Sequence, residues 1–331
     1  MNILLNGYFD KNFGDDAMQE LVVNHFKEFN FYPNCKQREM LRHLEKYENV
    51  HIGVPIPEID LFLNVIGTGF LYQTKFAKIT KLYEVLFKKR AKYPRMALVD
   101  CSVERFTSKT EEWLVKKGIS QYDFITCRDD VSYEFLKENV KKTPIFKFND
   151  IIFDGDYARV SNGNCLGIAP VNRVKSEKNY AYYKELAAFA DKYIETENKE
   201  VKLFAFDTGN ENDILAVMSI KNLMRNKDKV KIVAYNSDVD EFVNEFCECE
   251  MIIGSRYHSI VLAVLNNINT IAVYDNEKIY RICRDFKIMG IKKDLLSGEK
   301  LMQSVKNYQH YSADTSDAKG HINTLSQFLT E

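Results

Sequence analysis

The sequence is most informative at Met251-Ile252-Ile253-Gly254-Ser255-Arg256-Tyr257-His258-Ser259, followed directly by Ile260-Val261-Leu262-Ala263-Val264-Leu265. The apolar residues 251–253 are typical of a buried strand, and the apolar run after residue 259 is typical of a helix. Open α/β sheets bind ligands at the carboxyl ends of their strands, and the backbone N–H groups at a helix start favour anions. The turn between strand and helix therefore predicts an anion site that contains Arg256 and His258.

The same alternation of short apolar runs and amphipathic helical patterns extends through the chain. In the first half we predict strands at 3–5, 61–66, 95–100 and 124–127, and helices at 16–29, 76–89, 110–117 and 130–139. In the second half we predict strands at 165–170, 201–206, 230–235, 251–254 and 270–274, and helices at 180–196, 211–224, 238–248 and 259–265. Strands that alternate with helices indicate a parallel, doubly wound sheet.

A polar, glycine-bearing stretch at 154–164 interrupts this progression. We therefore expect an α/β protein with two Rossmann-like domains, an N-terminal one at 1–155 and a C-terminal one at 165–331. The length of 331 residues agrees with two domains of ordinary size. In such an arrangement we expect the ligand site in a cleft between the two domains, where strand ends meet.

Composition restricts the classes of function. The 46 basic and 47 acidic residues leave a net charge of -1, which argues against a nucleic acid partner. No segment resembles a membrane span or a signal peptide, so we expect a cytoplasmic protein. The basic segment 87–92 is a candidate for peripheral contact with a membrane, with an ordinary solvated surface as the alternative. The seven cysteines include no Cys-x-x-Cys pair, so we expect reduced thiols and no metal site.

A second turn follows the first predicted strand, at residues 6–17. Gly14 allows the backbone to approach a ligand closely. Asp15 or Asp16 either caps the following helix or accepts a proton from a substrate hydroxyl. The loop lacks the G-x-G-x-x-G pattern, so no dinucleotide is expected. A further turn, with Gly67 and Gly69, is either a close contact between strand and helix or a wall of an acceptor site.

Two more predicted strands end in charged side chains. Arg128 lies at a helix start, where a cation opposes the helix dipole, so it either binds an anion or pins a nearby carboxylate. Lys278 follows the strand at 270–274 and is expected at the rim of the ligand cleft, with a solvated surface lysine as the alternative. The helix at 180–196 begins with tyrosines that either stack on a sugar or divide between core and surface, namely Tyr180, Tyr182 and Tyr183.

Taken in chain order, these motifs resemble those of the polysaccharide pyruvyl transferase family, over about residues 3–285. The matching pieces are the loop at 7–17, Gly67-Thr68-Gly69, Arg128-Asp129 with Ser132-Tyr133, Asn149-Asp150, Arg256-Tyr257-His258, and Tyr274-Asp275 with Lys278. The chain departs from the family in having Asp150-Ile151 where aspartate-proline is frequent, and in a glycine turn that is less rich. The resemblance implies a glycosyltransferase-B-like fold. It also implies transfer of pyruvate from phosphoenolpyruvate to two hydroxyls of a sugar in a lipid-linked precursor of a bacterial surface polysaccharide.

The resemblance also implies roles for the candidate residues. His258 would be the general acid, and Arg256 would bind the phosphate or carboxylate of phosphoenolpyruvate. Asp15 or Asp16 would orient or deprotonate the acceptor hydroxyl. Positive charge and close backbone contacts would come from the remaining candidates, Arg128, Lys278, Gly14, Gly67 and Gly69. No metal and no cofactor besides the co-substrate phosphoenolpyruvate is expected, because arginines can neutralise the anion.

Two other functions remain compatible with these residues. The first is a glycosyltransferase that uses a nucleotide sugar, in which the Arg-x-His turn would hold a diphosphate. The second is a non-catalytic scaffold of a polysaccharide assembly complex, which would tolerate changes at Arg256 and His258.

Overall fold

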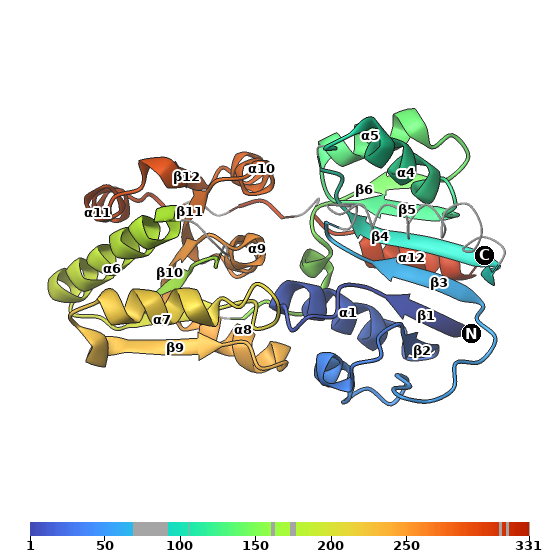
Figure 1. The fold of residues 1–331 in the computed structure, drawn as a ribbon, viewed down its shortest axis with the longest axis horizontal. Helices are drawn as coiled ribbons and strands as arrows, with labels where there is room; N and C mark the ends of the chain where they lie inside the picture. The colour runs from blue at the N-terminus through green and yellow to red at the C-terminus, as the bar shows by residue number, and fades with distance from the viewer. Residues whose placement is uncertain are drawn as a thin grey trace. The chain divides into compact units, whose positions relative to one another are not determined.

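The computed structural model describes residues 1–68, 92–104, 106–159, 163–172, 177–310, 313–315 and 318–330. The chain divides into two compact units. The first contains residues 1–9, 15–155 and 316–331, and the second contains residues 10–14 and 156–315. Each unit is built on a six-stranded sheet (Figure 1).

The strands of the first unit are β1 (Asn2–Asn6), β2 (Asn30–Pro33), β3 (Leu61–Val65), β4 (Arg95–Cys101), β5 (Phe124–Cys127) and β6 (Ile145–Lys147). Its helices are α1 (Phe13–His25), apart from the first two residues, and α4 (Lys109–Ile119), α5 (Asp130–Asn139) and α12 (His321–Thr330). The strands pair in parallel in the order β2-β1-β3-β4-β5-β6. The chain therefore adds β2 on one side of β1 and all later strands on the other side, so the strand order changes direction between β1 and β3.

Helices cover both faces of the first sheet. Val115 of α4 and Leu136 of α5 belong to the buried cluster that contains Leu98 and Ile125 of the strands. On the opposite face, the ring of Phe328 in α12 stacks on Phe124 at 4.9 Å. Figure 1 shows the red α12 among the blue and green strands.

The C-terminal helix corrects the predicted domain bounds, which placed everything from 165 to 331 in one domain. Asp154 accepts hydrogen bonds from the backbone N–H groups of Gly320 (2.8 Å) and Ile322 (2.7 Å) at the start of α12. His321, which is completely buried, pairs with the Thr126 hydroxyl at 2.6 Å. These contacts place residues 316–331 in the first unit.

The strands of the second unit are β7 (Cys165–Ala169), β8 (Val201–Ala205), β9 (Val230–Ala234), β10 (Cys249–Gly254), β11 (Asn269–Tyr274) and β12 (Met289–Lys292). Its helices are α6 (Glu177–Glu197), α7 (Ile214–Leu223), α8 (Val239–Cys247), α9 (Tyr257–Leu265), α10 (Glu277–Asp285) and α11 (Gly298–Lys306). The strands are parallel in the order β12-β11-β10-β7-β8-β9. The chain adds β8 and β9 on one side of β7 and then β10 to β12 on the other side, so the strand order changes direction between β7 and β10.

The second sheet is also covered on both faces. Leu186 of α6 and Ile220 of α7 share one buried cluster with Ile168 of β7. On the other face, the ring of Phe204 in β8 packs against Phe246 of α8 with centroids 5.2 Å apart. Helices on both faces of a parallel sheet are the doubly wound arrangement that the sequence predicts.

Residues 10–14 belong to the second unit, although the sequence analysis placed them in a continuous N-terminal domain. The Phe13 ring is completely buried, and its neighbours include Phe206 at 5.3 Å and Phe242 at 5.0 Å. The backbone N–H of Phe13 also donates to the Phe206 carbonyl at 2.9 Å. An aromatic cluster of the second unit therefore determines where this loop lies.

Candidate functional site

The Arg–Tyr–His turn, residues Arg256 to His258, lies between β10 and α9. The strand ends at Gly254 and the helix begins at Tyr257, so Arg256 occupies the position directly before the helix. Strand β10 pairs with β7 at the point where the chain direction across the sheet reverses. Open α/β sheets bind ligands at such switch points, just beyond the strand ends. The predicted strand–turn–helix arrangement is therefore confirmed for this motif.

Two carboxylates that the sequence analysis did not single out hold Arg256. Its Nε donates to Asp213 Oδ2 at 2.7 Å and its Nη2 to Asp213 Oδ1. Its Nη1 pairs with Glu211. Asp213 is completely buried, whereas the Glu211 side chain is 54% exposed. One side of the guanidinium is therefore fixed in the interior, and the other meets a carboxylate at the surface.

The charge of Arg256 is stabilised by these partners. Burial lowers the pKa of the guanidinium, but Asp213 and Glu211 raise it by more, so the net shift is upward. The Asp213 carboxylate also accepts backbone N–H bonds from Asn172 (2.8 Å) and Asp207 (3.1 Å). A carboxylate with this many donors is positioned firmly, and it orients the arginine in turn.

His258 is half-buried and stands directly against Gly14. A Cβ atom on Gly14 would lie 1.7 Å from His258 Nδ1, so the imidazole occupies the space that any side chain at residue 14 would need. The loop that carries Gly14 is held in the second unit because Asn12 Nδ2 donates to Asp207 Oδ2 at 3.1 Å. Gly14 and His258 are thus brought together, although 244 positions separate them in the printed sequence.

Lys278 joins the same group of residues. It lies in the first turn of α10, and its Nζ is 4.1 Å from the centroid of the Tyr257 ring. The Tyr257 and His258 rings meet edge to face with centroids 5.2 Å apart. The second unit therefore gathers a guanidinium, an imidazole and an ammonium group at neighbouring strand ends, which is a chemistry suited to an anion and a proton transfer.

Arg128 lies in the first unit, in a buried cluster of charges. Only 1% of its side chain is exposed, and Nη1 donates to Asp150 at 2.7 Å and to Asp100 at 3.1 Å. A Cβ on Gly67 would come within 2.7 Å of its Nη2. Of the two roles considered for Arg128, binding an anion or holding a nearby carboxylate, these contacts are those of the second. Gly67, which has no side chain, leaves room for the guanidinium. A role of either residue in ligand binding stays a prediction.

The two aspartates of the N-terminal loop differ in their surroundings. Asp16 is completely buried and lies 3.3 Å from Nδ1 of His43, while Asp15 is half-buried. Neither is the residue that precedes α1. Asn12 holds that place, and its Oδ1 accepts from the Gly14 N–H at 3.0 Å. The prediction that an aspartate caps this helix is wrong, because the helix begins at Phe13 and both carboxylates lie inside its first turn.

Sequence reasoning missed His43, whose imidazole is buried beside Asp16 and whose Nε2 pairs with Gln19 Oε1 at 2.9 Å. Burial, together with the nearby Lys46, lowers the pKa of His43 to about 3. Burial therefore favours the neutral form of this ring. No local pattern marks this histidine, because it lies in a 3-10 helix of three residues, Arg42–Leu44, within the long connection between β2 and β3.

The remaining predictions concern glycine, basic, aromatic and metal-binding residues away from the Arg–Tyr–His turn. Gly69 and most of the basic segment 87–92 fall outside the described residues. The tyrosines divide as the second alternative proposed, since Tyr182 and Tyr183 are buried and Tyr180 is 61% exposed. No helix in the described part of the chain is long and apolar enough to cross a membrane. Within those same ranges, no group of three or more His, Cys, Asp or Glu side chains is placed to hold a metal ion.

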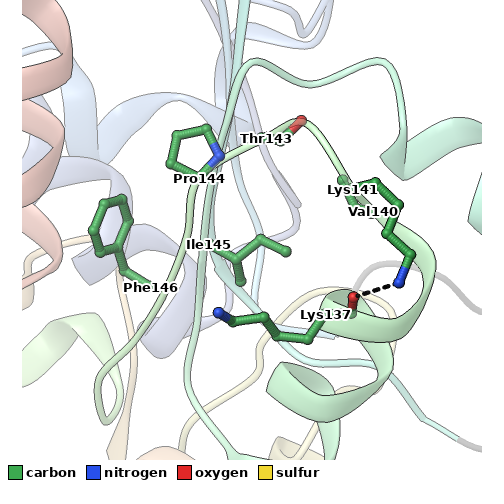
Figure 2. A pocket seen from close by; sticks show the side chains of 7 residues that line it. All are labelled: Lys137, Val140, Lys141, Thr143, Pro144, Ile145 and Phe146. Atoms are coloured by element: carbon green, nitrogen blue, oxygen red, sulfur yellow. Dashed lines mark hydrogen bonds between the residues drawn. The ribbon is translucent and has the colours of Figure 1, made fainter.

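A surface hollow of about 370 Å³ lies in the first unit, between the end of α5 and the edge strand β6. Figure 2 shows its lining, Lys137, Val140, Lys141, Thr143, Pro144, Ile145 and Phe146. The hollow contains none of the predicted site residues.

The model of the polysaccharide pyruvyl transferase family matches residues 12–277. No curated protein sequence matches the chain. Among solved structures, UDP-GlcNAc 2-epimerase from Methanocaldococcus jannaschii is similar with a TM-score of 0.64 and 12% identity, over 100% of both chains.

Two further solved structures resemble the chain. The Neisseria meningitidis UDP-GlcNAc 2-epimerase bound to UDP-GlcNAc gives a TM-score of 0.58 at 11% identity, over 100% of both chains. Anabaena Alr3699/HepE in complex with UDP and glucose gives 0.59 at 10% identity, over 100% of this chain and 99% of that one. At these identities the likeness shows the fold, and it confirms the predicted α/β fold with two Rossmann-like, glycosyltransferase-B-like halves.

Proposed function

Since the chain belongs to the polysaccharide pyruvyl transferase family, we propose that it transfers the pyruvyl group of phosphoenolpyruvate to two hydroxyls of a sugar in a surface polysaccharide precursor. The products are a cyclic ketal and inorganic phosphate. The observation that carries this proposal is the grouping of Arg256, His258 and Lys278 at neighbouring strand ends of the second unit. Cations bind the phosphate and carboxylate of such a ligand, and an imidazole supplies a proton near neutral pH.

The reaction begins at the methylene carbon of phosphoenolpyruvate. His258 gives this carbon a proton, which makes the neighbouring carbon electron-poor, and one sugar hydroxyl forms a C–O bond there. The C–O bond to phosphate then breaks, and the second hydroxyl forms the other C–O bond of the ketal. Each hydroxyl loses its proton, so one proton ends on the new methyl group and one on the departing phosphate. Arg256 and Lys278 bind the charge of the phosphate and the carboxylate throughout.

A carboxylate is proposed to receive the proton of the attacking hydroxyl. Asp15 and Asp16 both remain candidates from the sequence. Asp16 has none of its surface exposed and contacts His43, whereas Asp15 is half-buried. We therefore assign the base role to Asp15 and a supporting role to Asp16.

The proposal is tested by phosphate release from phosphoenolpyruvate, measured across a panel of sugar acceptors. His258→Gln should lower the rate by about 10²–10⁴-fold, the usual loss when a positioned acid is removed. His310→Gln is the matched control, since His310 is exposed and contacts Asn269. Near-normal activity of His258→Gln would exclude this histidine as the acid. Absence of phosphate release by the unmodified protein with every acceptor would instead favour the scaffold function.

A glycosyltransferase that uses a nucleotide sugar is the second candidate. The observation in its favour is the fold similarity to proteins whose structures contain UDP or UDP-GlcNAc. A thermal-shift measurement separates the two functions, because a ligand stabilises the protein that binds it. Stabilisation by phosphoenolpyruvate supports the pyruvyl transfer, and stabilisation by UDP alone supports the alternative.

The requirements and surroundings of the reaction form part of the proposal. Arg256 and Lys278 supply the positive charge, so we expect activity to survive a metal chelator and to need no added cofactor. We also propose that the acceptor is lipid-linked and that the protein works in the cytoplasm, at the inner face of the membrane, without a nucleic acid partner. Sedimentation with liposomes that contain or lack anionic lipid tests the membrane contact.

A further inference from the structure

Three neighbouring strands of the second sheet each deliver a cation just beyond their carboxyl ends. Arg256 follows β10, Lys278 follows β11, and Lys293 follows β12. These strands are adjacent in the order β12-β11-β10, all parallel. Neighbouring strands lie about 4.8 Å apart, so the row of backbone positions spans on the order of 10 Å. The three cationic residues therefore all follow strands at the same edge of the sheet.

Lys293, which the sequence analysis did not single out, is held in place more firmly than a surface lysine. Only 12% of its side chain is exposed. Its Nζ lies 4.5 Å from the centroid of the Tyr182 ring and 3.2 Å from Asn179 Oδ1. The carboxylate of Asp275 is farther away, at 3.8 Å. Lysines are mostly solvated, so an ammonium group fixed over an aromatic ring at a strand end indicates a specific use.

Lys293 is linked to the Arg–Tyr–His turn through two side chains. Tyr182, which carries the ammonium group on its ring, is buried, and its hydroxyl lies 2.6 Å from Ser255 Oγ. Ser255 directly precedes Arg256. Burial raises the pKa of the Tyr182 hydroxyl, so this hydroxyl stays protonated and the link keeps its hydrogen bond. The positions of Lys293 and Arg256 are therefore coupled by packed, hydrogen-bonded groups.

We propose that Lys293 forms a second anion subsite, which takes the carboxylate of an enolpyruvyl ligand while Arg256 takes its phosphate. This inference rests on the proposed function. We divide the two anions in this way because Arg256 directly precedes α9, where backbone N–H groups and the helix dipole favour the doubly charged phosphate, which leaves the single carboxylate to Lys293. Lys278, in α10 after the strand between them, adds charge to both anions. Lys293 thus distinguishes phosphoenolpyruvate from inorganic phosphate.

The test compares the affinities of the whole chain for phosphoenolpyruvate and for inorganic phosphate, both measured by isothermal titration calorimetry. Lys293→Met keeps the length of the side chain and removes its charge. We expect it to weaken phosphoenolpyruvate binding about 10-fold or more, the loss of one charge-assisted hydrogen bond, and to leave phosphate binding unchanged. Lys292→Met is the matched control, because Lys292, the last residue of β12, is the exposed neighbour of Lys293. It should change neither affinity.

A second variant keeps the test decisive if Lys293→Met folds poorly. Lys293→Arg retains the charge and the contact with the Tyr182 ring, so it should keep most of the preference for phosphoenolpyruvate over phosphate. Equal weakening of both ligands by Lys293→Met, or no weakening of either, overturns the second subsite. If the unmodified protein binds phosphate but does not prefer phosphoenolpyruvate, the proposed function itself fails, and the subsite fails with it.

Discussion

Replacing Gly14 with alanine tests whether the backbone at the start of α1 sets the position of His258. The new Cβ would lie 1.7 Å from Nδ1 and 2.1 Å from Cε1 of the imidazole. Ordinary van der Waals contact begins at 3.4 Å, so the ring has to retreat by about 1.7 Å, the difference between 3.4 and 1.7 Å. A misplacement of about 1 Å costs a catalytic group on the order of 10²-fold in rate. We therefore expect phosphate release from phosphoenolpyruvate to fall by at least about 10²-fold.

The same substitution should change stability little. The imidazole ends a side chain that rotates away, and alanine is favoured over glycine inside a helix by about 1 kcal/mol. Urea denaturation should therefore show a free energy of unfolding within about 1 kcal/mol of the unmodified protein. The activity loss would then have a positional cause rather than an unfolding one.

A double variant makes this reasoning refutable. In a His258→Ala background the ring that meets the new Cβ is absent, so adding Gly14→Ala should cause no further loss of rate. Residues in contact show this kind of non-additivity. Near-normal activity of Gly14→Ala alone would refute the positional argument, and so would an equal loss in both backgrounds.

Three further predictions concern stability. Asp213→Asn removes the buried counter-charge of Arg256, and we expect the free energy of unfolding in urea to fall by about 3 kcal/mol; a fall under about 1 kcal/mol would show that the pair is not needed. Gly67→Ala puts a Cβ 2.7 Å from Arg128 Nη2, and we expect calorimetry to give a Tm lower by roughly 4 °C, while an unchanged Tm would mean that the guanidinium moves freely. Burial and Lys46 lower the pKa of His43 from 6.5 to about 3, so between these values the unfolded chain binds a proton that the folded chain does not, and stability is lost as pH falls. His43→Gln should flatten the decline in unfolding free energy between pH 7 and 5, and an unaltered slope would contradict this assignment.

The alternation of strands and helices was predictable because each element has its own pattern of apolar residues along consecutive positions. Buried central strands such as β3 and β10 are short apolar runs, and α9 is apolar along most of its length. The edge strands β2, β6 and β12 were missed because each has only three or four residues, too few for an alternating pattern to be visible in the sequence.

The site residues that lie together in one turn were predictable from the sequence. Those that reach the site from distant segments were not. Arg256 and His258 stand out because strand, turn and helix are consecutive. Asp213 was read as part of a helix beginning at 211, whereas α7 begins at Ile214. Residues 211–213 do not join the helix, because the Asp213 carboxylate binds Arg256 and because Asn212 adopts a φ of 49°, which is not helical. No periodicity in the sequence reports such a pairing across 43 positions.

The exchange of short segments between the two units has a consequence for biosynthesis. Phe13 is made early, yet the aromatic cluster that buries it contains Phe206 and Phe242, which leave the ribosome much later. Conversely, the first sheet waits for α12, the last helix of the chain, to cover Phe124. Domains usually fold one after another as they emerge. The first unit therefore cannot complete its core before α12 has been made, whereas the second needs an early loop and nothing after residue 315, so the second unit is the first whose residues are all available for folding.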